Sequence, residues 1–266
     1  MSIEEDTGMS IGVQSGEDTA PYRERVAIVT GGGSGIGRAT ALRFAARGAR
    51  VLVVGRRAEP LEETARLGDG IAALAADVGQ DAGAPAVIGR ALELWGRVDI
   101  LVNNAGAFAA APLQDTTADL VATLFATNVG GPTWLAQAAL PHLAATRGAI
   151  VNVSSTYGHK ATAGAAHYAA SKAALEQLTR CWALEVAPRG VRVNAVAPGP
   201  TDTPILARAG LPAEAIAALK RTETARIPLG RRGTPEDVAV WIVALADSTV
   251  WVTGQIVAVD GGLSTT

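Results

Sequence analysis

Seven short apolar runs, each rich in Val, Ile, Leu or Ala, recur along the chain, with longer helical patterns between most of them. The runs lack sustained polar alternation, which is typical of strands in a sheet that is covered on both faces. Most intervening stretches are long enough for right-handed helical crossovers between parallel strands. The sequence therefore predicts an α/β fold with a doubly wound parallel sheet of about seven strands, flanked by helices. The expected strands are 26–30, 50–54, 71–75, 100–103, 149–153, 192–196 and 256–259.

Composition is consistent with one large domain. The chain has 266 residues, of which 48% are hydrophobic and 18% charged, so it can bury a substantial core. The net charge of −2 gives no reason to expect nucleic acid or an anionic membrane as a partner. We expect a single domain over residues 23–266.

The first 22 residues differ from the rest. They are polar and acidic and contain no apolar run long enough for a signal peptide or a membrane span. We expect a flexible polar tail over 1–22. The single cysteine, Cys181, excludes an internal disulfide and suits a cytoplasmic location.

A glycine-rich segment follows the first expected strand. Residues 30–37 read Thr-Gly-Gly-Gly-Ser-Gly-Ile-Gly and precede an expected helix at 38–47. Glycines between a strand and a helix let the backbone approach a pyrophosphate at the helix N-terminus, as in Rossmann-like folds. A flexible loop would also collect glycine. No Gly-Lys-Ser/Thr follows, which disfavours a P-loop.

Tyr168 and Lys172 lie four residues apart, so in a helix they share one face. A phenol has a pKa near ~10, and a neighbouring ammonium lowers it toward neutrality, where acid/base catalysis is efficient. Ser155 ends an apolar run thirteen residues before the tyrosine. The alternative is that the tyrosine and lysine are unrelated side chains on an amphipathic helix.

Together, these motifs resemble the short-chain dehydrogenase/reductase family. The glycine motif has the spacing T-G-x-x-x-G-x-G, and Ser155, Tyr168 and Lys172 stand at the family's active-site spacing. The resemblance covers about residues 23–263. It implies an NAD(P)-dependent oxidoreductase that interconverts a small ketone or aldehyde and an alcohol. The alternative is a dinucleotide-binding sensor or scaffold of the same fold without turnover.

The resemblance also implies a role for each catalytic residue. Tyr168 exchanges a proton with the substrate oxygen, and Ser155 hydrogen-bonds that oxygen. Lys172 lowers the tyrosine pKa and binds the nicotinamide ribose. Asn128 bends its helix and anchors a water that connects the lysine to solvent. Polar filler in a helix is the alternative for Asn128.

Further residues are implied as cofactor contacts. Those of the glycine segment are Gly31, Gly33, Ser34, Gly35, Ile36 and Gly37. Asp77 and Val78 would hold the adenine, and Asn104, Ala105 and Gly106 would lie near the ribose. Pro198, Gly199, Thr201 and Thr203 would contact the nicotinamide carboxamide, beside Tyr168 and Lys172. Residues 200–226 would form a lid over the substrate.

The end of the second expected strand predicts a preference for NADP(H). Gly55 stands where an acid normally accepts the ribose hydroxyls of NAD, and Arg56 and Arg57 follow it. Guanidinium groups suit phosphate oxygens, and glycine does not repel them. The arginines could instead be ordinary surface charges. NAD(H) stays possible, because Ser34 occupies a position that is basic in many NADP-preferring relatives.

The helical patterns at 117–143 and 166–187 carry more apolar surface than one sheet face requires. In the family these helices pair about a two-fold axis and the closing strand region makes a second interface, which together predict a homotetramer, with a dimer as the second expectation. Both helices could instead pack only on their own sheet. The three histidines, His142, His159 and His167, do not have a metal-ligand spacing, so no metal is expected.

Overall fold

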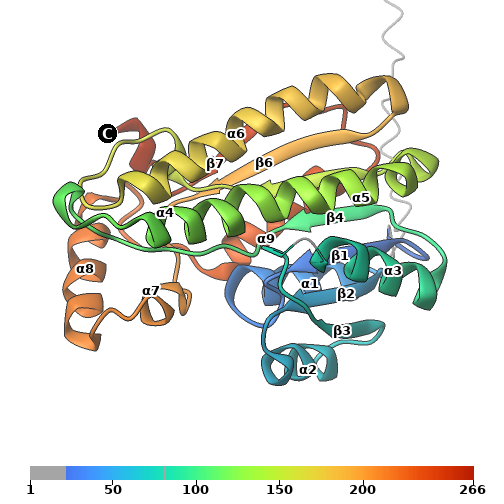
Figure 1. Cartoon of the computed structure of the whole chain (residues 1–266), viewed down its shortest axis with the longest axis horizontal. Coiled ribbons are helices and arrows are strands. Elements are labelled where there is room, and N and C mark those ends of the chain that lie inside the picture. The colour runs from blue at the N-terminus through green and yellow to red at the C-terminus, as the bar shows by residue number, and fades with distance from the viewer. Residues whose placement is uncertain (1–21, 81) are drawn as a thin grey trace, which may run out of the picture.

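The computed structural model describes residues 22–80 and 82–266. Seven parallel strands form one sheet in the order β3-β2-β1-β4-β5-β6-β7 (Figure 1). This confirms the predicted fold class. The strands are β1 (Val26–Thr30), β2 (Arg50–Gly55), β3 (Ile71–Ala75), β4 (Ile100–Asn103), β5 (Ala149–Val153), β6 (Arg192–Pro198) and β7 (Ile256–Val259).

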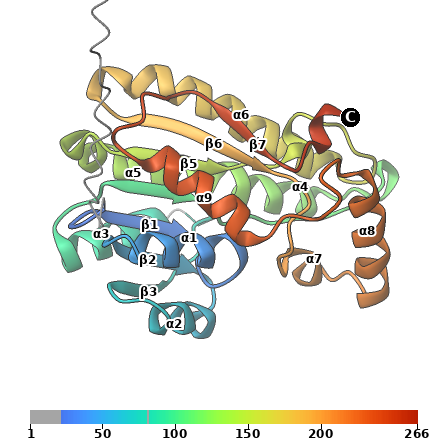
Figure 2. The same cartoon turned by 180° about the vertical axis from the view of Figure 1, so that it is seen from behind.

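Helices cover both faces of the sheet, as Figures 1 and 2 show from opposite sides. The helices are α1 (Gly35–Ala45), α2 (Ala58–Arg66), α3 (Gly83–Trp95), α4 (Ala118–Phe125), α5 (Gly131–Thr146), α6 (Ala166–Val186), α7 (Ile205–Arg208), α8 (Ala213–Arg226) and α9 (Pro235–Ala246). In β1, Val26 and Ile28 join the core formed with α3, α5 and α6. Ala27 and Val29 join the opposite core, formed with α1 and α9. Successive side chains point to opposite faces, so a sheet buried on both faces has apolar residues at successive strand positions, except where a buried polar side chain is hydrogen-bonded.

The carboxyl ends of the strands are joined by buried polar contacts. Asn103, at the end of β4, donates through Nδ2 to Oδ1 of Asn152 in β5 (2.9 Å). The Thr30 hydroxyl oxygen accepts from the backbone N–H groups of Asn104 (3.0 Å) and Ala105 (2.9 Å). These contacts connect β4 to β1 and β5 at the carboxyl edge of the sheet, where ligands bind in folds of this kind.

Two helices differ from the sequence expectation. The helix expected at 38–47 begins earlier, at Gly35, because Ser34 takes an extended backbone conformation and Gly35 to Gly37 already form the first turn. The helical pattern at 117–143 is divided into α4, a π-helical turn at Ala126–Gly130, and α5. Asn128 lies in this turn, so the helix is interrupted at the position where the family resemblance implies a bend.

The boundary of the expected tail also differs. Residues 1–21 lie outside the described part of the chain, but Tyr22 belongs to the folded domain. Its side chain is 2% exposed and its hydroxyl donates to the carbonyl oxygen of Val243 (2.6 Å). Its ring packs edge-on against Phe44, with the ring centres 5.2 Å apart.

Two glycines in helices give opposite expectations for the same substitution. A Cβ at Gly37 would come against the Gly31 carbonyl oxygen and lie 2.5 Å from Asn104 Nδ2, whereas a Cβ at Gly89 meets nothing within 4 Å. We expect Gly37→Ala to lower the free energy of unfolding by about 1–3 kcal/mol through overpacking. Gly89→Ala should raise it by about 0.5–1 kcal/mol. Urea unfolding of both variants checks this, and a stabilised Gly37→Ala would contradict the geometry.

Candidate active site

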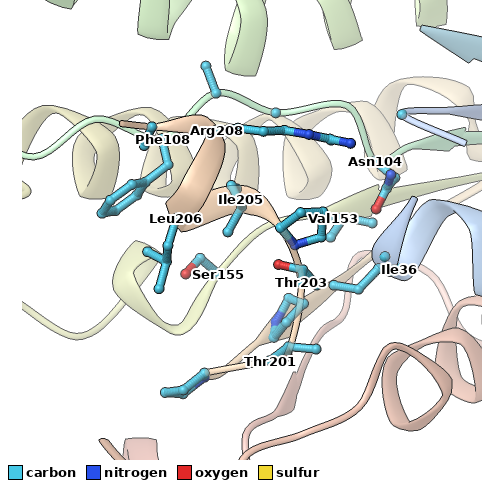
Figure 3. Close-up of a pocket in the computed structure, with 18 of the residues that line it drawn as sticks. Ile36, Asn104, Phe108, Val153, Ser155, Thr201, Thr203, Ile205, Leu206 and Arg208 are labelled. Carbon is cyan, nitrogen blue, oxygen red and sulfur yellow. The ribbon is translucent and has the colours of Figure 1, made fainter. Parts of the chain in front are cut away.

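A cavity of about 330 Å³ opens at the carboxyl edge of the sheet (Figure 3). It lies between the glycine segment, the ends of β4 to β6, and α7. Most of the predicted site residues meet there. The predicted residues that line the cavity are Gly31, Ser34, Gly35, Ile36, Arg56, Asn104, Ala105, Gly106, Ser155, Lys172, Pro198, Gly199, Thr201 and Thr203.

The glycine segment presents bare backbone to this cavity. Gly31 (φ 67°) and Gly35 (φ 51°) take left-handed conformations that disfavour other residues. A Cβ at Gly31 would lie 2.7 Å from Asn104 Nδ2. The N-terminus of α1 begins here and has no acidic residue in its first turn. These features fit the pyrophosphate of a dinucleotide, which requires close backbone approach and a positive helix end.

Other predicted residues do not line the cavity. They are Gly33, Gly37, Arg57, Asp77, Val78, Asn128 and Tyr168. Val78 is buried in the core beside α3 and α5. Asp77 is exposed, and its Oδ1 accepts from the backbone N–H of Gly79 (3.0 Å). Adenine binding by this pair stays a prediction.

Tyr168 lies on α6 behind two other aromatic rings. It is 8% exposed and packs edge-on against Phe108 (4.9 Å between ring centres) and Tyr157 (6.3 Å). Burial raises the pKa of Tyr168 to about 12, and the nearby Ser155 side chain opposes that rise. Since Ser155 lines the cavity, it connects the tyrosine hydroxyl to the space where a substrate would bind.

Lys172 follows Tyr168 by one helical turn, as predicted. Its Nζ donates to the carbonyl oxygen of Val153 (2.8 Å) and lies 5.9 Å from the Tyr168 ring centre. Burial lowers the pKa of Lys172 to about 8, and Glu176 acts in the opposite direction. Burial therefore moves the two pKa values apart, so the lysine loses its proton at a lower pH than the tyrosine. The predicted lowering of the tyrosine pKa by Lys172 is not seen, because burial is the largest influence on that pKa and Lys172 is not among the groups that shift it.

Asn128 is fully buried, and its side chain has three hydrogen bonds. Its Oδ1 accepts from the Ala107 N–H (2.8 Å), and its Nδ2 donates to the Ala107 carbonyl (2.9 Å) and to Ser171 Oγ (3.0 Å). It thus joins the loop after β4 to α6, beside Lys172. The side chain is therefore held inside the protein by hydrogen bonds, and π-helical turns are frequent at functional sites.

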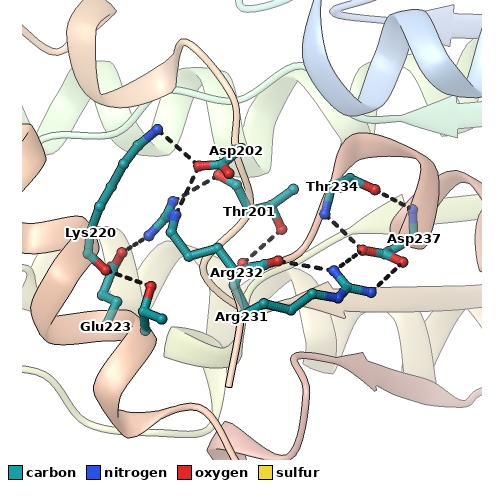
Figure 4. Close-up of polar contacts among 10 residues, drawn as sticks. Thr201, Asp202, Lys220, Glu223, Arg231, Arg232, Thr234 and Asp237 are labelled. Atoms are coloured by element: carbon teal, nitrogen blue, oxygen red, sulfur yellow. Dashed lines mark hydrogen bonds and ion pairs between the residues drawn. The ribbon is translucent and has the colours of Figure 1, made fainter. Parts of the chain in front are cut away.

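The segment after β6 carries α7 and α8, where the sequence predicts a lid. Figure 4 shows how its base is held. Asp202 accepts from Lys220 Nζ (2.9 Å) and Arg232 Nε (2.9 Å), and Arg232 also pairs with Glu223. The hydrogen bond from Lys220 lowers the pKa of Asp202, and Arg232 adds to the effect. These ion pairs connect α8 to Asp202, just after β6, and to Arg232, just before α9.

Several lid residues that the sequence analysis placed only as part of a range reach the cavity, among them three from α7. Ile205, Leu206 and Arg208 line it, and the Arg208 guanidinium extends across it (Figure 3). Their helix, α7, spans only four residues. Such a short segment has no periodicity that could show which side chains face inward. Glu176, a buried carboxylate on α6, was also missed.

No helix within residues 22–80 and 82–266 is long and apolar enough to cross a membrane. In the same part of the chain, no group of three or more His, Cys, Asp or Glu side chains is placed to hold a metal ion.

The fold and cavity define a dinucleotide-binding α/β protein, and comparison with known proteins identifies its family. A family model described as Enoyl-(Acyl carrier protein) reductase matches residues 31–264. A cis-4-hydroxycyclohexanecarboxylate dehydrogenase from Sinomonas cyclohexanicum is 43% identical over 91% of this chain and 97% of its own. The chain belongs to the short-chain dehydrogenase/reductase family.

Solved structures agree. A short-chain dehydrogenase/reductase of unknown function from Caenorhabditis elegans, solved with cofactor, superposes with a TM-score of 0.87 at 35% identity, covering 92% of this chain and 97% of its own. A 3-ketoacyl-(acyl-carrier-protein) reductase from Brucella melitensis, complexed with NADH, has a TM-score of 0.84 at 32% identity, covering 91% and 99%. The protein is therefore an oxidoreductase that uses a nicotinamide cofactor and acts on a small molecule.

Proposed function

We propose that the protein interconverts a ketone or aldehyde and an alcohol, with NADP(H) as the preferred cofactor. The observation that carries the proposal is the meeting of Ser155, Tyr168 and Lys172 beside the glycine-lined cavity. A sensor or scaffold would have no chemical need for this set. Cofactor oxidation in the presence of a panel of ketones tests turnover, and binding of cofactor without turnover of any of them would favour the scaffold.

When bound, the nicotinamide supplies or accepts the hydride. In the reductive direction, Tyr168 donates its phenolic proton to the substrate oxygen. A high pKa keeps Tyr168 protonated for that step. Ser155 donates a hydrogen bond to the same oxygen and stabilises the charge that develops there. Lys172 holds the nicotinamide ribose, and Asn128 fixes the turn beside the lysine and anchors the water that resupplies the proton.

The remaining contacts follow the same proposal. The glycine segment holds the pyrophosphate, Asp77 and Val78 hold the adenine, and the turn from Pro198 to Thr203 holds the carboxamide. Phe108, Tyr157 and Leu206 line the cavity and supply apolar walls for the substrate, with residues 200–226 as its lid. The cytoplasmic location expected from the sequence stays a prediction.

The NADP(H) preference is supported by charges at the open end of the cavity. Arg56 and the lid residue Arg208 both line it, and repulsion from Arg57 and Arg56 adds to the burial that lowers the pKa of Arg208. With glycine at position 55 there is no carboxylate at the end of β2. A Cβ added there would contact only Leu61, at 3.6 Å. The Brucella melitensis relative is complexed with NADH, so kcat/KM is to be measured with both cofactors.

We also propose a homotetramer. Trp134 on α5 is 42% exposed and Leu184 on α6 is 80% exposed, while Trp241 on α9 (47%) and Trp251 before β7 (100%) are exposed on a second surface. Contiguous exposed apolar patches mark protein–protein interfaces, and we propose that these side chains belong to two of them. Light scattering should give close to four times 27.0 kDa, and Trp241→Ser with Trp251→Ser should reduce this to a dimer. A 27.0 kDa species at micromolar concentration would contradict the proposal.

A further inference from the structure

A carboxylate is buried beside the proposed catalytic residues without a place in the mechanism above. The Glu176 side chain lies one helical turn after Lys172 on α6 and is 4% exposed. Its Oε1 accepts a hydrogen bond from Ser154 Oγ (2.8 Å) and faces His159 Nδ1 at 3.2 Å. Burying a carboxylate is costly unless it is paired and hydrogen-bonded, so these contacts need an explanation.

The contacts of Glu176 hold the segment that carries Ser155. Ser154 is the preceding residue in the chain, and its hydroxyl also lies 3.3 Å from the Lys172 carbonyl oxygen. His159 ends the 3-10 turn Thr156–Gly158 that follows Ser155. Gly158 packs directly on Glu176, since a Cβ there would come against the carboxylate. One carboxylate therefore contacts the chain on both sides of the proposed catalytic serine.

The titratable groups around Glu176 come from three segments of the chain. Lys172 and Tyr168 precede it on α6, and His159 faces it from the loop after β5. Asp260, after β7, lies near enough to His159 for the two to attract each other. Lys172 is the closest of these groups along α6, since positions four apart on a helix are neighbours.

We propose that Glu176 is a positioning residue that keeps Lys172 charged and, through Ser154 and His159, holds the Ser155 loop in place. Burial favours the neutral amine at position 172, and the Glu176 carboxylate opposes it. A neutral lysine would offer the nicotinamide ribose no positive charge. The effect on turnover rests on the function proposed above, whereas the effect on the charge of Lys172 does not.

The chain has only three lysines, Lys160, Lys172 and Lys220, so the charge can be measured directly. Lysine enriched in ¹³C at Cε gives one resonance for each, and Lys160→Arg and Lys220→Arg assign them. In the wild type we expect Lys172 to titrate near pH 8. In Glu176→Gln, which keeps the shape but not the charge, the midpoint should fall by about one pH unit, a tenfold loss of proton affinity.

Matched variants separate charge from shape. Glu185→Gln removes an exposed carboxylate from the same helix and should leave the midpoint unchanged. Glu176→Asp keeps the charge and should stay closer to the wild type than Glu176→Gln. Ser154→Ala keeps the carboxylate and should shift the midpoint by less than about 0.3 units. If Glu176→Gln does not fold, Glu176→Met gives the same comparison without a polar group that needs partners.

An unchanged Lys172 midpoint in the folded Gln or Met variant would overturn the inference. Turnover gives the second measurement. The basic limb of the kcat profile should move to lower pH together with the Lys172 midpoint. If the midpoint moves and the limb does not, the inference about Glu176 stands, and the role proposed for Lys172 in catalysis fails.

Discussion

Tyr168→Phe is expected to lower kcat by ~10²–10⁴-fold, the usual contribution of a positioned acid/base group. The substitution removes only the hydroxyl, so the ring contacts with Phe108 and Tyr157 are retained. Cofactor affinity should change little, since the glycine segment and Lys172 are untouched. Steady-state kinetics with a substrate from the ketone panel, together with cofactor titration, measures both quantities.

Neighbouring residues supply matched controls for this result. Tyr157→Phe removes a hydroxyl from a ring beside Tyr168 and should change kcat only a few-fold. Ser155→Ala should cost ~10²–10³-fold through loss of the oxyanion contact, whereas Ser154→Ala should cost less than about tenfold, because the Ser154 hydroxyl is directed at Glu176. Near wild-type turnover in Tyr168→Phe, or equal losses at both serines, would refute the proposed mechanism.

Gly55→Asp is expected to reverse or erase the preference for NADPH over NADH. An acid at this position repels a 2′-phosphate and accepts hydrogen bonds from the ribose hydroxyls of NAD. We expect the ratio of kcat/KM values for NADPH and NADH to fall by ~10–100-fold, which corresponds to about 1.4–2.8 kcal/mol. The measurement is kcat/KM for both cofactors with one substrate.

Gly55→Ala is the control for shape. Its Cβ would lie 3.6 Å from Leu61, an ordinary contact, and Gly55 does not have a positive φ. This variant should keep the preference of the wild type. Arg56→Ala should weaken the binding of NADPH more than the binding of NADH, because Arg56 lines the cavity. A wild type that favours NADH would mean that the arginines do not bind a phosphate.

Much of the fold could be predicted from the sequence because its signals are local. All seven strands lie where apolar runs predict them, and the largest boundary change is β6, which continues to Pro198. The glycine segment joins β1 to α1, and Tyr168 and Lys172 share one face of α6. Helical spacing sets that last relation, whatever the rest of the molecule does.

The electrostatics of the site could not be predicted in the same way. The pKa of Tyr168 was expected to fall under the influence of Lys172, but burial raises it and lowers the pKa of the lysine. Burial depends on Phe108 and Tyr157, which come from other segments of the chain. A residue spacing contains no information about how far a group is removed from water.

The sequence by itself determined the parallel sheet, the glycine segment after β1 and the positions of Ser155, Tyr168 and Lys172. Each depends on residue type and spacing within one stretch of chain. Only the tertiary structure decided which lid side chains reach the cavity. It also decided that Glu176 contacts Ser154 and His159 next to the active site. Those contacts join residues 17 and 22 positions apart, and they form only when α6 packs against the end of β5.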